Sequence, residues 1–230
     1  MTSRPITTLF LLVSADGKIS TGDTDAMDFD RDLPKIKGVK EGLAQYYAIE
    51  RTTDFFSLNS GRVMAKVGVN RKTWEGKPLP VSFIIIDNKP HLTKKGLEYF
   101  AKKSKRLFVV TTNKSHLALR AKYPNLHVLL YSKKIDLKDM MARMKRDYGA
   151  KRITIQTGGT LNAEFIRRGL VDRISFVIAP VLVGGKSTAT AMDGESLRRT
   201  SELFKLKALK LRKVKKLKHS YLHLQYDVIN

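Results

Sequence analysis

The chain has 230 residues, of which 42% are hydrophobic and 28% are charged, a composition typical of globular rather than disordered proteins. No apolar run approaches the roughly 20 residues that a membrane-spanning helix needs, and the short apolar run near the N-terminus predicts a buried strand rather than a secretion signal. The chain has no cysteine, which excludes disulfides and thiolate metal sites, and we expect a cytoplasmic location.

The chain is strongly basic. It has 44 Lys and Arg residues against 21 Asp and Glu residues, a formal net charge of +23. Such a charge attracts any polyanion, so nucleic acid is the first partner to consider. The basic residues are spread along the sequence, however, and none of the common nucleic-acid-binding modules is visible. The densest cluster, Lys205 to Lys218, alternates with apolar residues, which indicates an amphipathic strand with a solvated basic face. We therefore expect neither a nucleic-acid partner nor a membrane partner.

Apolar runs of strand length recur along the chain, with helical patterns between most of them. The runs are Ile6–Val13, Phe55–Leu58, Val81–Ile86, Leu107–Thr111, Leu126–Tyr131, Ile153–Ile155 and Ile174–Ile178. Apolar residues share one helix face between Ile36 and Tyr47, between Leu137 and Tyr148, and again from Leu161. This alternation predicts an α/β fold with a mostly parallel central sheet covered on both faces.

The last stretch changes character. Phe204–Leu211 and Tyr221–Val228 alternate with period two, which predicts a C-terminal antiparallel hairpin at the sheet edge, where lysines discourage unwanted pairing. The longest polar connection, from Lys66 to Pro80, contains the single tryptophan, Trp74, and is a candidate flap. The sequence shows no repeat and no long linker, so we predict one domain over residues 1–230.

The turn after Ile153–Ile155 is the most informative local pattern. The strand leads into Thr157-Gly158-Gly159-Thr160-Leu161-Asn162, where an amphipathic helix begins. Two glycines at such a turn let backbone N–H groups converge, and the helix dipole adds partial positive charge there. This combination predicts a phosphate cradle, although an ordinary tight turn would account for the same residues equally well.

Several segments occur in the order and spacing of one family: TLFLLVSADGKIS, TDFFSLNSGRVMAKVG, PVSFIIIDN, VVTTN and TGGTLNAEFIRRGLVDRISFVIAPVLVGGK. Over nearly its whole length the chain resembles the reductase domain of riboflavin biosynthesis. The resemblance implies a dihydrofolate reductase-like three-layer fold, NADPH as cofactor, a small phosphorylated pyrimidine as substrate, and a homodimer. The implied reaction reduces the ribosylamino group of 5-amino-6-(5-phosphoribosylamino)uracil, or of its 2,5-diaminopyrimidinone counterpart, to ribitylamino.

The resemblance also implies roles for individual residues. The cofactor pyrophosphate would lie at Gly158, Gly159, Thr160, Leu161 and Asn162. The nicotinamide would lie beside Val13, Ser14 and Ala15, and further cofactor contacts would come from Gly61 and Asn88. By position, the adenosine ribose and its 2′-phosphate would be held by Thr111, Thr112, Asn113 and Lys114, unless these four are only the polar entry to a helix. Asn59, Arg62 and Gln156 are expected to bind substrate.

Two titratable residues lie nearest the expected reacting centre. Asp16 and Lys18 could move a proton or orient substrate, and Asp16 could equally be a turn residue. No metal site is expected, because His219 and His223 read as surface residues of a strand and the zinc signature of the pathway's deaminase is missing.

Some positions depart from the family pattern. Gln156 stands where many relatives carry Glu, and Arg62 and Lys66 stand where Thr and Asp are common. Added positive charge changes which anion fits. Two alternatives therefore stay open: a dihydrofolate reductase-like NADPH reductase with a different substrate, and a basic nucleic-acid-binding protein on the same scaffold.

Overall fold

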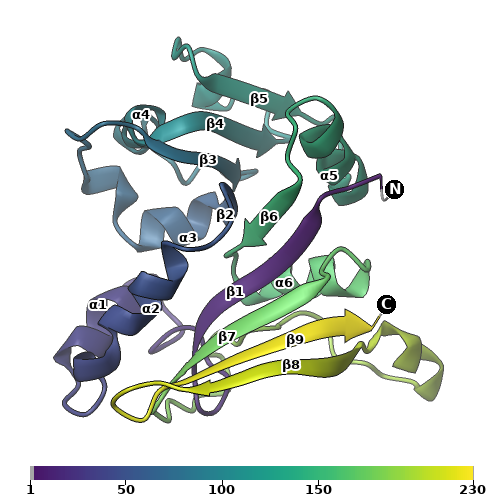
Figure 1. Cartoon of the computed structure of the whole chain (residues 1–230). Helices are drawn as coiled ribbons and strands as arrows, with labels where there is room; N and C mark the ends of the chain where they lie inside the picture. Colours follow the sequence, from purple (N-terminus) through teal and green to yellow (C-terminus); the bar gives the residue numbers. More distant parts are fainter. Residues whose placement is uncertain (1–2, 230) are drawn as a thin grey trace. The chain divides into compact units, whose positions relative to one another are not determined.

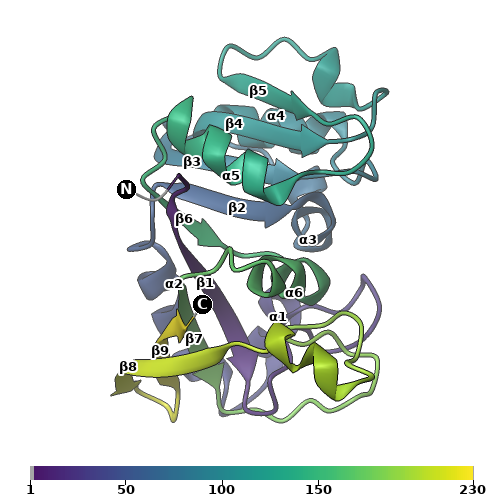
Figure 2. The same cartoon turned by 90° about the vertical axis from the view of Figure 1, so that its right-hand side faces the viewer.

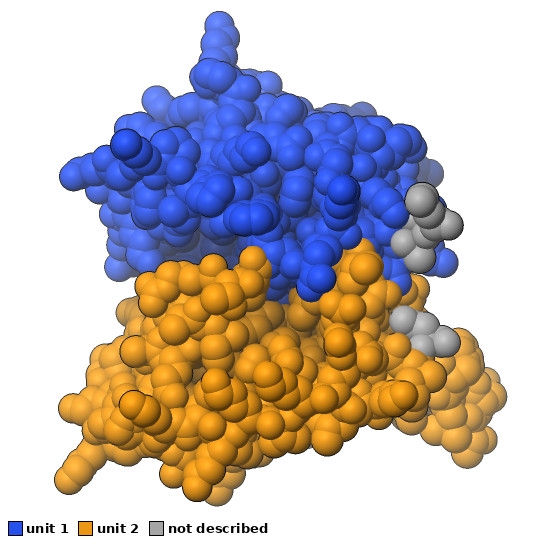
Figure 3. Space-filling view, viewed as in Figure 1, with its two compact units in different colours: residues 1–5, 54–157 blue, residues 6–53, 158–230 orange. Residues whose placement is uncertain are grey.

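The computed structural model describes residues 3–229, which form two compact units interleaved along the chain. Figure 3 colours unit 1, residues 1–5 and 54–157, and unit 2, residues 6–53 and 158–230. The chain passes between the units after Pro5, after Thr53 and after Thr157. The described part holds no helix that is long and apolar enough to cross a membrane.

Unit 1 is built on a parallel sheet with strand order β5-β4-β3-β2-β6 (Figure 1). Its strands are β2 (Phe56–Ser60), β3 (Leu79–Ile86), β4 (Ser104–Thr111), β5 (Leu126–Leu130) and β6 (Arg152–Ile155). Its helices are α3 (Gly61–Lys66), α4 (Lys94–Lys103) and α5 (Leu137–Arg146), with short 3₁₀ turns η3 (Val69–Arg71) and η4 (Leu117–Leu119). Because the strands are parallel, their carboxyl ends lie at one edge of this sheet.

Alternating side chains give this sheet two buried faces, and Figure 2 shows α4 and α5 on opposite faces. On one face, Phe83 packs against Phe100 of α4, with ring centroids 5.2 Å apart. On the other, Phe108 packs edge-to-face against Tyr148, which follows α5, at 4.6 Å. Burial on both faces explains the continuous apolar runs in β3 and β4.

The polar connection between Lys66 and Pro80 is docked on α4. The Trp74 ring meets Tyr99 edge-to-face at 6.3 Å, and the Lys103 ammonium lies 5.4 Å from the indole centroid. The indole N–H donates to the Lys77 carbonyl at 3.2 Å. The candidate flap therefore has an aromatic anchor at its middle.

Unit 2 contains a mixed sheet with strand order β1-β7-β9-β8. β1 (Ile6–Ser14) and β7 (Arg173–Ala179) are parallel, whereas β9 (Leu222–Ile229) is antiparallel to both β7 and β8 (Ala208–Lys216). The helices are α1 (Phe29–Asp32), α2 (Ala44–Glu50) and α6 (Gly159–Arg167), and the 3₁₀ turns are η1 (Leu33–Lys35), η2 (Lys40–Gly42) and η5 (Thr200–Lys205). Figure 2 shows α2 and α6 on opposite sides of β1.

A buried core fills one face of this second sheet. Phe10 of β1 stacks on Tyr46 of α2 with ring centroids 5.2 Å apart, and Val177 of β7 belongs to the same cluster. Tyr221, at the start of β9, is fully buried there and donates its hydroxyl to the Val39 carbonyl. The beginning of β9 is thereby tied to the helical segment around η2.

The structure confirms the predicted α/β fold with a mostly parallel sheet and a C-terminal antiparallel hairpin, and it corrects two elements. The helix predicted from Ile36 to Tyr47 is interrupted, because Gly38 adopts φ +86° and only α2 is a true helix. The strand predicted over Phe204–Leu211 begins later, at Ala208, and continues to Lys216. Its first part is the 3₁₀ turn η5, stabilised by the Glu202 carboxylate, which accepts two backbone N–H groups.

Candidate cofactor-binding site

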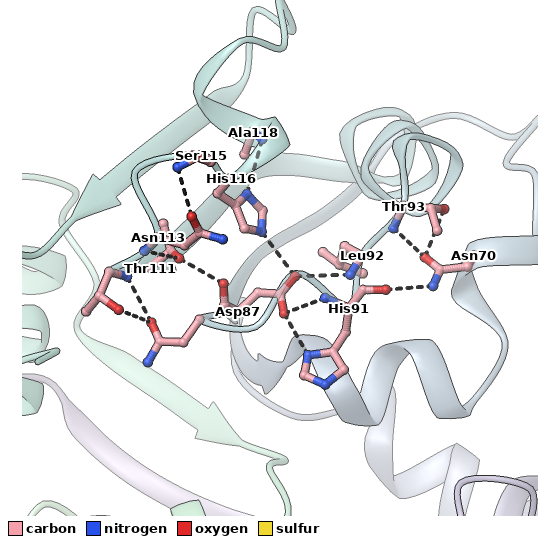
Figure 4. Close-up of polar contacts among 12 residues, drawn as sticks. Asn70, Asp87, His91, Leu92, Thr93, Thr111, Asn113, Ser115, His116 and Ala118 are labelled. Atoms are coloured by element: carbon pink, nitrogen blue, oxygen red, sulfur yellow. Dashed lines mark hydrogen bonds and ion pairs between the residues drawn. The ribbon is translucent and has the colours of Figure 1, made fainter.

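A buried carboxylate organises the carboxyl ends of β3 and β4 in unit 1. Asp87 directly follows β3, and its side chain is fully buried. Its Oδ1 lies 3.1 Å from both the backbone N and the ring Nδ1 of His91 (Figure 4). Its Oδ2 accepts from the Leu92 N–H at 3.0 Å and from His116 Nε2 at 3.2 Å. His116 is also buried, and its Nδ1 accepts from the Ala118 N–H, so Nε2 carries the donated proton.

These donors decide the charge of Asp87. Burial by itself raises the pKa of this carboxyl, but the hydrogen bonds from His116, from the backbone of His91 and from Leu92 outweigh burial and hold the pKa below its usual value. Asp87 is therefore ionised at neutral pH. Gly61, the first residue of α3, packs directly on it, since a Cβ at this position would lie 2.2 Å from Oδ1. Gly61 thus has a packing reason to be glycine.

The residues expected around the adenosine form hydrogen bonds with one another through their side-chain oxygens. The Asn88 Oδ1 accepts from the backbone N–H and the hydroxyl of Thr112, at 2.9 and 3.3 Å. The Thr111 hydroxyl donates to the Asp87 carbonyl at 2.9 Å and accepts from the Asn113 N–H at 3.1 Å. This set joins the end of β3 to the end of β4.

The same residues leave hydrogen-bond donors unused. Asn113 Oδ1 accepts from the Ser115 N–H at 2.8 Å, so both asparagine oxygens are occupied. The side-chain amide nitrogens of Asn88 and Asn113 and the ammonium of Lys114 have no partner among residues 3–229. A cluster that presents donors and a positive charge suits a ligand with phosphate or hydroxyl oxygens. We call Asn88, Asn113 and Lys114 the donor cluster.

The expected substrate residues form a second group in unit 1. Buried Asn59, on β2, donates its side-chain amide to the Ser57 hydroxyl at 2.9 Å. That hydroxyl in turn donates to Oε1 of Gln156, just beyond β6, at 3.1 Å. Arg62 is exposed in the first turn of α3. The structure therefore connects Asn59 to Gln156 through Ser57, a residue that the sequence did not single out.

The Gly-Gly turn of unit 2 begins α6 as predicted. Gly158 is the N-cap residue, with ordinary extended dihedrals and no side-chain cap. The N–H groups of Leu161 and Asn162 both bond to the Gly158 carbonyl at 3.0 Å. In the described range, the N–H groups of Gly159 and Thr160 make no hydrogen bond. Open N–H groups at the positive end of a helix are the ordinary means of binding phosphate.

Packing within unit 2 accounts for two residues of this turn. A Cβ on Gly159 would lie 2.3 Å from the Thr190 carbonyl and 2.3 Å from Asp193 Oδ2. Asn162 is fully buried and donates its side-chain amide to the Ala191 carbonyl at 2.9 Å. Gly159 and Asn162 therefore hold the loop at residues 190–193 against α6, and Gly158 is the better probe of a phosphate site.

Asp16 and Lys18 hold a loop at the end of β1. The Asp16 carboxylate accepts from the Ser14 hydroxyl at 2.6 Å and from the N–H groups of Gly184 and Val183. These bonds, the Ser14 bond foremost, lower the pKa of Asp16 to about 2, so it is a permanent carboxylate at neutral pH and cannot donate a proton. Lys18 donates its ammonium to the carbonyl of Gly185 at 2.7 Å. Both side chains therefore hold the loop at residues 183–185 beside the end of β1.

The other two residues expected beside the nicotinamide lie next to this loop. Val13 is buried in β1, and the Ala15 N–H donates to the Val181 carbonyl at 2.9 Å. The end of β1 is thus fixed to the segment that follows β7.

Sequence reasoning overlooked the centre of the unit 1 network. No role was assigned to Asp87 from the sequence, and His116 lies 29 residues further along the chain. No sequence spacing links such a pair, because the sheet alone brings the two strand ends together. The overlooked histidines do not indicate a metal centre, since the described residues contain no group of three or more His, Cys, Asp or Glu arranged to hold an ion.

Comparison with known proteins places the chain among reductases. Residues 5–222 match the RibD C-terminal domain family. The 2,5-diamino-6-ribosylamino-4(3H)-pyrimidinone 5′-phosphate reductase of Methanothermobacter thermautotrophicus is 32% identical over 79 residues, 34% of this chain and 36% of that protein. The riboflavin biosynthesis protein RibD of Actinobacillus pleuropneumoniae is 25% identical over 210 residues, 90% of this chain and 53% of that protein. The matches thus span between about a third and a half of these relatives.

Solved structures show the same fold. Acinetobacter baumannii RibD (form 1) superposes with a TM-score of 0.69 at 17% identity, covering 100% of this chain and 59% of that one. The riboflavin biosynthesis reductase Rib7 of Saccharomyces cerevisiae gives 0.62 at 15% identity, covering 100% and 92%. The chain belongs to the RibD C-terminal domain family, a family of NAD(P)H-dependent pyrimidine reductases.

Proposed function

We propose that this protein is an NADPH-dependent reductase of riboflavin biosynthesis. Its substrate would be 5-amino-6-(5-phosphoribosylamino)uracil or 2,5-diamino-6-(5-phosphoribosylamino)pyrimidin-4-one, whose ribosylamino group becomes ribitylamino. The observation that carries this proposal is the donor cluster, because it offers unpaired amide hydrogens and an ammonium at the carboxyl ends of parallel strands. Ligands of open α/β sheets bind at this edge.

NADPH fits the donors that the chain presents. The adenosine 2′-phosphate is assigned to Lys114 and the amide of Asn113, and the pyrophosphate to the open N–H groups of Gly159 and Thr160. Both groups present hydrogen-bond donors. The side-chain oxygens of Asn88 and Asn113 are already occupied, so an anion with many acceptor oxygens suits the donors that remain. Bound NADPH would supply the hydride, and the protein would supply position and electrostatics.

The remaining residues would orient the substrate. Ionised Asp16 and cationic Lys18 fix the loop beside the end of β1 and provide a charged pair at the assigned reacting centre. Gln156 would present a neutral amide to the pyrimidine, held in place by Ser57. Exposed Arg62 would meet the substrate phosphate.

The protein is further proposed to be a homodimer in the cytoplasm, folded as one domain. The supporting observation is the apolar face of the C-terminal hairpin, formed by Leu209, Leu211 and Val214 of β8 and by Leu222 and Leu224 of β9. The three β8 residues are 42, 53 and 54% exposed, although each is a good core residue. Exposed apolar patches mark association sites. Lys210, Lys213 and Lys215 of β8 project from the opposite face, and Lys216, which pairs with Leu222, is the single lysine of β8 on the apolar side, at its end. A second copy would therefore meet a face that is mostly apolar.

Changing one residue on either face of β8 tests the dimer. Leu211→Glu should convert the dimer to a monomer in light scattering at 0.15 M salt, because it buries a carboxylate in the contact. Lys213→Glu, on the opposite face of the same strand, should leave the dimer intact. A wild-type monomer, or dissociation by both variants, would refute this interface.

Turnover assays test the proposed reaction. NADPH oxidation should depend on the pyrimidine phosphate, and the product should be two mass units heavier than the substrate. A related reductase with a different substrate is the second candidate, favoured by the positive charges of Arg62 and Lys66 where relatives carry Thr and Asp. NADPH binding without turnover of either pyrimidine phosphate would support that candidate and reject the first.

A further inference from the structure

The C-terminal hairpin has a second face, which is basic. The antiparallel register pairs Lys210 with Asp227, Lys213 with Gln225 and Lys215 with His223. These residues alternate with the apolar face defined above, so they project from the opposite side of the strands. A register shift between Leu211 and Lys213 adds Arg212 to this side, where its side chain lies 3.4 Å from Asp227. We call Lys210, Arg212, Lys213 and Lys215 the basic face.

The positive charge of this face is almost uncompensated. All nine residues of β8 are exposed, and Lys210, Lys213 and Lys215 form no ion pair with any residue from 3 to 229. Asp227 is the single acidic residue in β7, β8 and β9, and Arg173 and Arg212 already face it at 3.8 and 3.4 Å. The result is an exposed strip of cationic side chains on a strand that is paired with β9.

The neighbouring histidine responds to this charge. His223 lies between the basic face and β7, with Nε2 2.8 Å from the Ser175 hydroxyl. Burial first, and then the charges of Lys213 and Lys215, lower its pKa. The register places both lysines on the side of His223, since Lys215 pairs with His223 and Lys213 with Gln225. A neutral His223 contributes no charge of its own.

We propose that the basic face binds the phosphate backbone of nucleic acid without sequence preference. Alternate residues of a strand are about 6.6–6.8 Å apart, so the lysines form a regular row of donors along one line. A row of cations that tracks a polyanion is the common feature of sequence-independent nucleic-acid binding. The sequence predicted a solvated basic face in this segment but no nucleic-acid partner. The proposal departs from that expectation because the register places four basic residues on one side of an exposed strand.

The chemistry of the face favours nucleic acid over a lipid surface. A protein segment that lies on a membrane places apolar side chains beside its lysines so that both reach the lipid together. Here Leu209, Leu211 and Val214 point away from the side that carries Lys210, Lys213 and Lys215. The neighbours of the lysines on the basic side are Gln225, His223 and Asp227, and the exposed apolar residue on this side of β9, Ile229, lies at the end of the strand beside Ala208. A single apolar side chain at one end does not make a lipid-inserting surface.

Neutralising the three unpaired lysines tests the proposal. The probe is a fluorescein-labelled 20-nucleotide oligo(dT), titrated with the full chain at several salt concentrations. The variant is K210Q/K213Q/K215Q, which removes three charges without adding repulsion. Its matched control is K72Q/K94Q/K95Q, which removes three charges from the lysines lining a cavity of about 340 Å³ beside α4. Circular dichroism and NADPH turnover, which uses neither lysine set, report whether each variant is folded.

The hairpin variant should bind at least about tenfold more weakly, and its slope of log affinity against log salt should shrink by about 2, since each phosphate contact on a single strand contributes about 0.7. The control should keep most of the wild-type slope. Three outcomes would overturn the proposal: no wild-type binding at 0.15 M salt, equal losses in both variants, or tighter lysine-dependent binding to phosphatidylserine vesicles than to the oligonucleotide.

Discussion

Asp87 shows how one side chain can position several others. Its carboxylate accepts four hydrogen bonds, and its carbonyl accepts the Thr111 hydroxyl, so it joins two strand ends at once. The donor cluster lies on those strand ends. Burying the carboxylate without these donors would lower the stability of the fold. Removing the carboxylate would leave the donors buried without a hydrogen-bond acceptor.

Asp87→Asn should lower the free energy of unfolding by about 3 kcal/mol, because an amide nitrogen would then face the donors of Leu92 or His116. Thermal melting checks this, with Asp136→Asn as control. Asp136 is an exposed cap of α5, and asparagine caps equally well, so that variant should lose little stability. Equal melting temperatures for both variants would contradict the central role of Asp87.

The same residue gives a pH dependence. The pKa of Asp87 in the folded chain lies below its ordinary value of 3.8. Its stabilising effect is therefore complete well above pH 3.8 and is lost as the pH falls below that value toward the folded-state pKa. The stability gap between wild type and Asp87→Asn should narrow below pH 4. A gap that stays constant from pH 7 to pH 3 would show that Asp87 does not titrate in this way.

Gly158 and Gly159 should behave differently when substituted. Gly158 has dihedrals that any residue adopts, so Gly158→Val should keep the fold and raise the KM for NADPH by about tenfold through obstruction of the phosphate. Gly159→Ala should instead lower the melting temperature, because its Cβ would collide with Thr190 and Asp193. An unchanged KM in Gly158→Val would mean that the turn is only structural.

Lys114→Ala should reduce the preference for NADPH over NADH by about tenfold, since a charge-assisted bond to phosphate contributes roughly 1.5–3 kcal/mol. The ratio of kcat/KM for the two cofactors measures this preference. Lys95→Ala, on α4, removes the same charge elsewhere and should leave the ratio unchanged. If both variants change the ratio equally, the effect belongs to the overall charge of the protein.

At the scale of elements, the turn between β8 and β9 has two residues with unfavourable backbone dihedrals, and hydrogen bonds and packing hold it in place. His219 and Ser220 adopt φ of 55° and 62°, a region that costs most residues about 1 kcal/mol or more. Gln45 exchanges two hydrogen bonds with Lys218, and Tyr221 is buried beside Gly42. The anchoring therefore keeps a turn that its own residues disfavour.

Ser220→Gly should stabilise the protein by about 1 kcal/mol, because glycine adopts this backbone freely. For a chain of this size the melting temperature should rise by roughly 2–4 °C. Ser132→Gly, whose backbone is not left-handed, should give no rise. A decrease in both variants would show that the turn is not strained.

Helices were predicted correctly where apolar residues recur over several turns, and they were missed where contacts with distant segments determine the structure. Leu137–Arg146 carries its apolar residues three and four apart over several turns, and it is a helix. The helix α4 was missed because lysines lie at both ends of its short apolar stretch and Gly96, a poor helix former, directly precedes that stretch. Gly96 is explained by Asn70, whose Oδ1 would lie 2.2 Å from a Cβ there. Such a contact between distant segments leaves no trace in local sequence.

At the scale of the whole molecule, family resemblance identified the fold and the class of reaction, while the local chemistry required coordinates. The sequence marked Asn88 and Lys114, but it did not show that the asparagine oxygens are occupied and only donors remain. It marked the lysines between Lys205 and Lys218 as the solvated face of an amphipathic strand, but it did not show their partners on β9 or the register shift that brings Arg212 to the same side. The occupied asparagine oxygens depend on hydrogen bonding and the basic face depends on strand register, and neither can be read from the sequence alone.

Calorimetric titration of the purified chain with NADPH and NADH at 0.15 M salt tests the central claim most directly. We predict one NADPH bound per chain with a dissociation constant between about 1 µM and 1 mM, the usual range for enzyme ligands, and NADH bound about tenfold more weakly. If NADPH does not bind at millimolar concentration, the proposed cofactor is wrong, and if both nucleotides bind equally, the donor cluster does not recognise the 2′-phosphate.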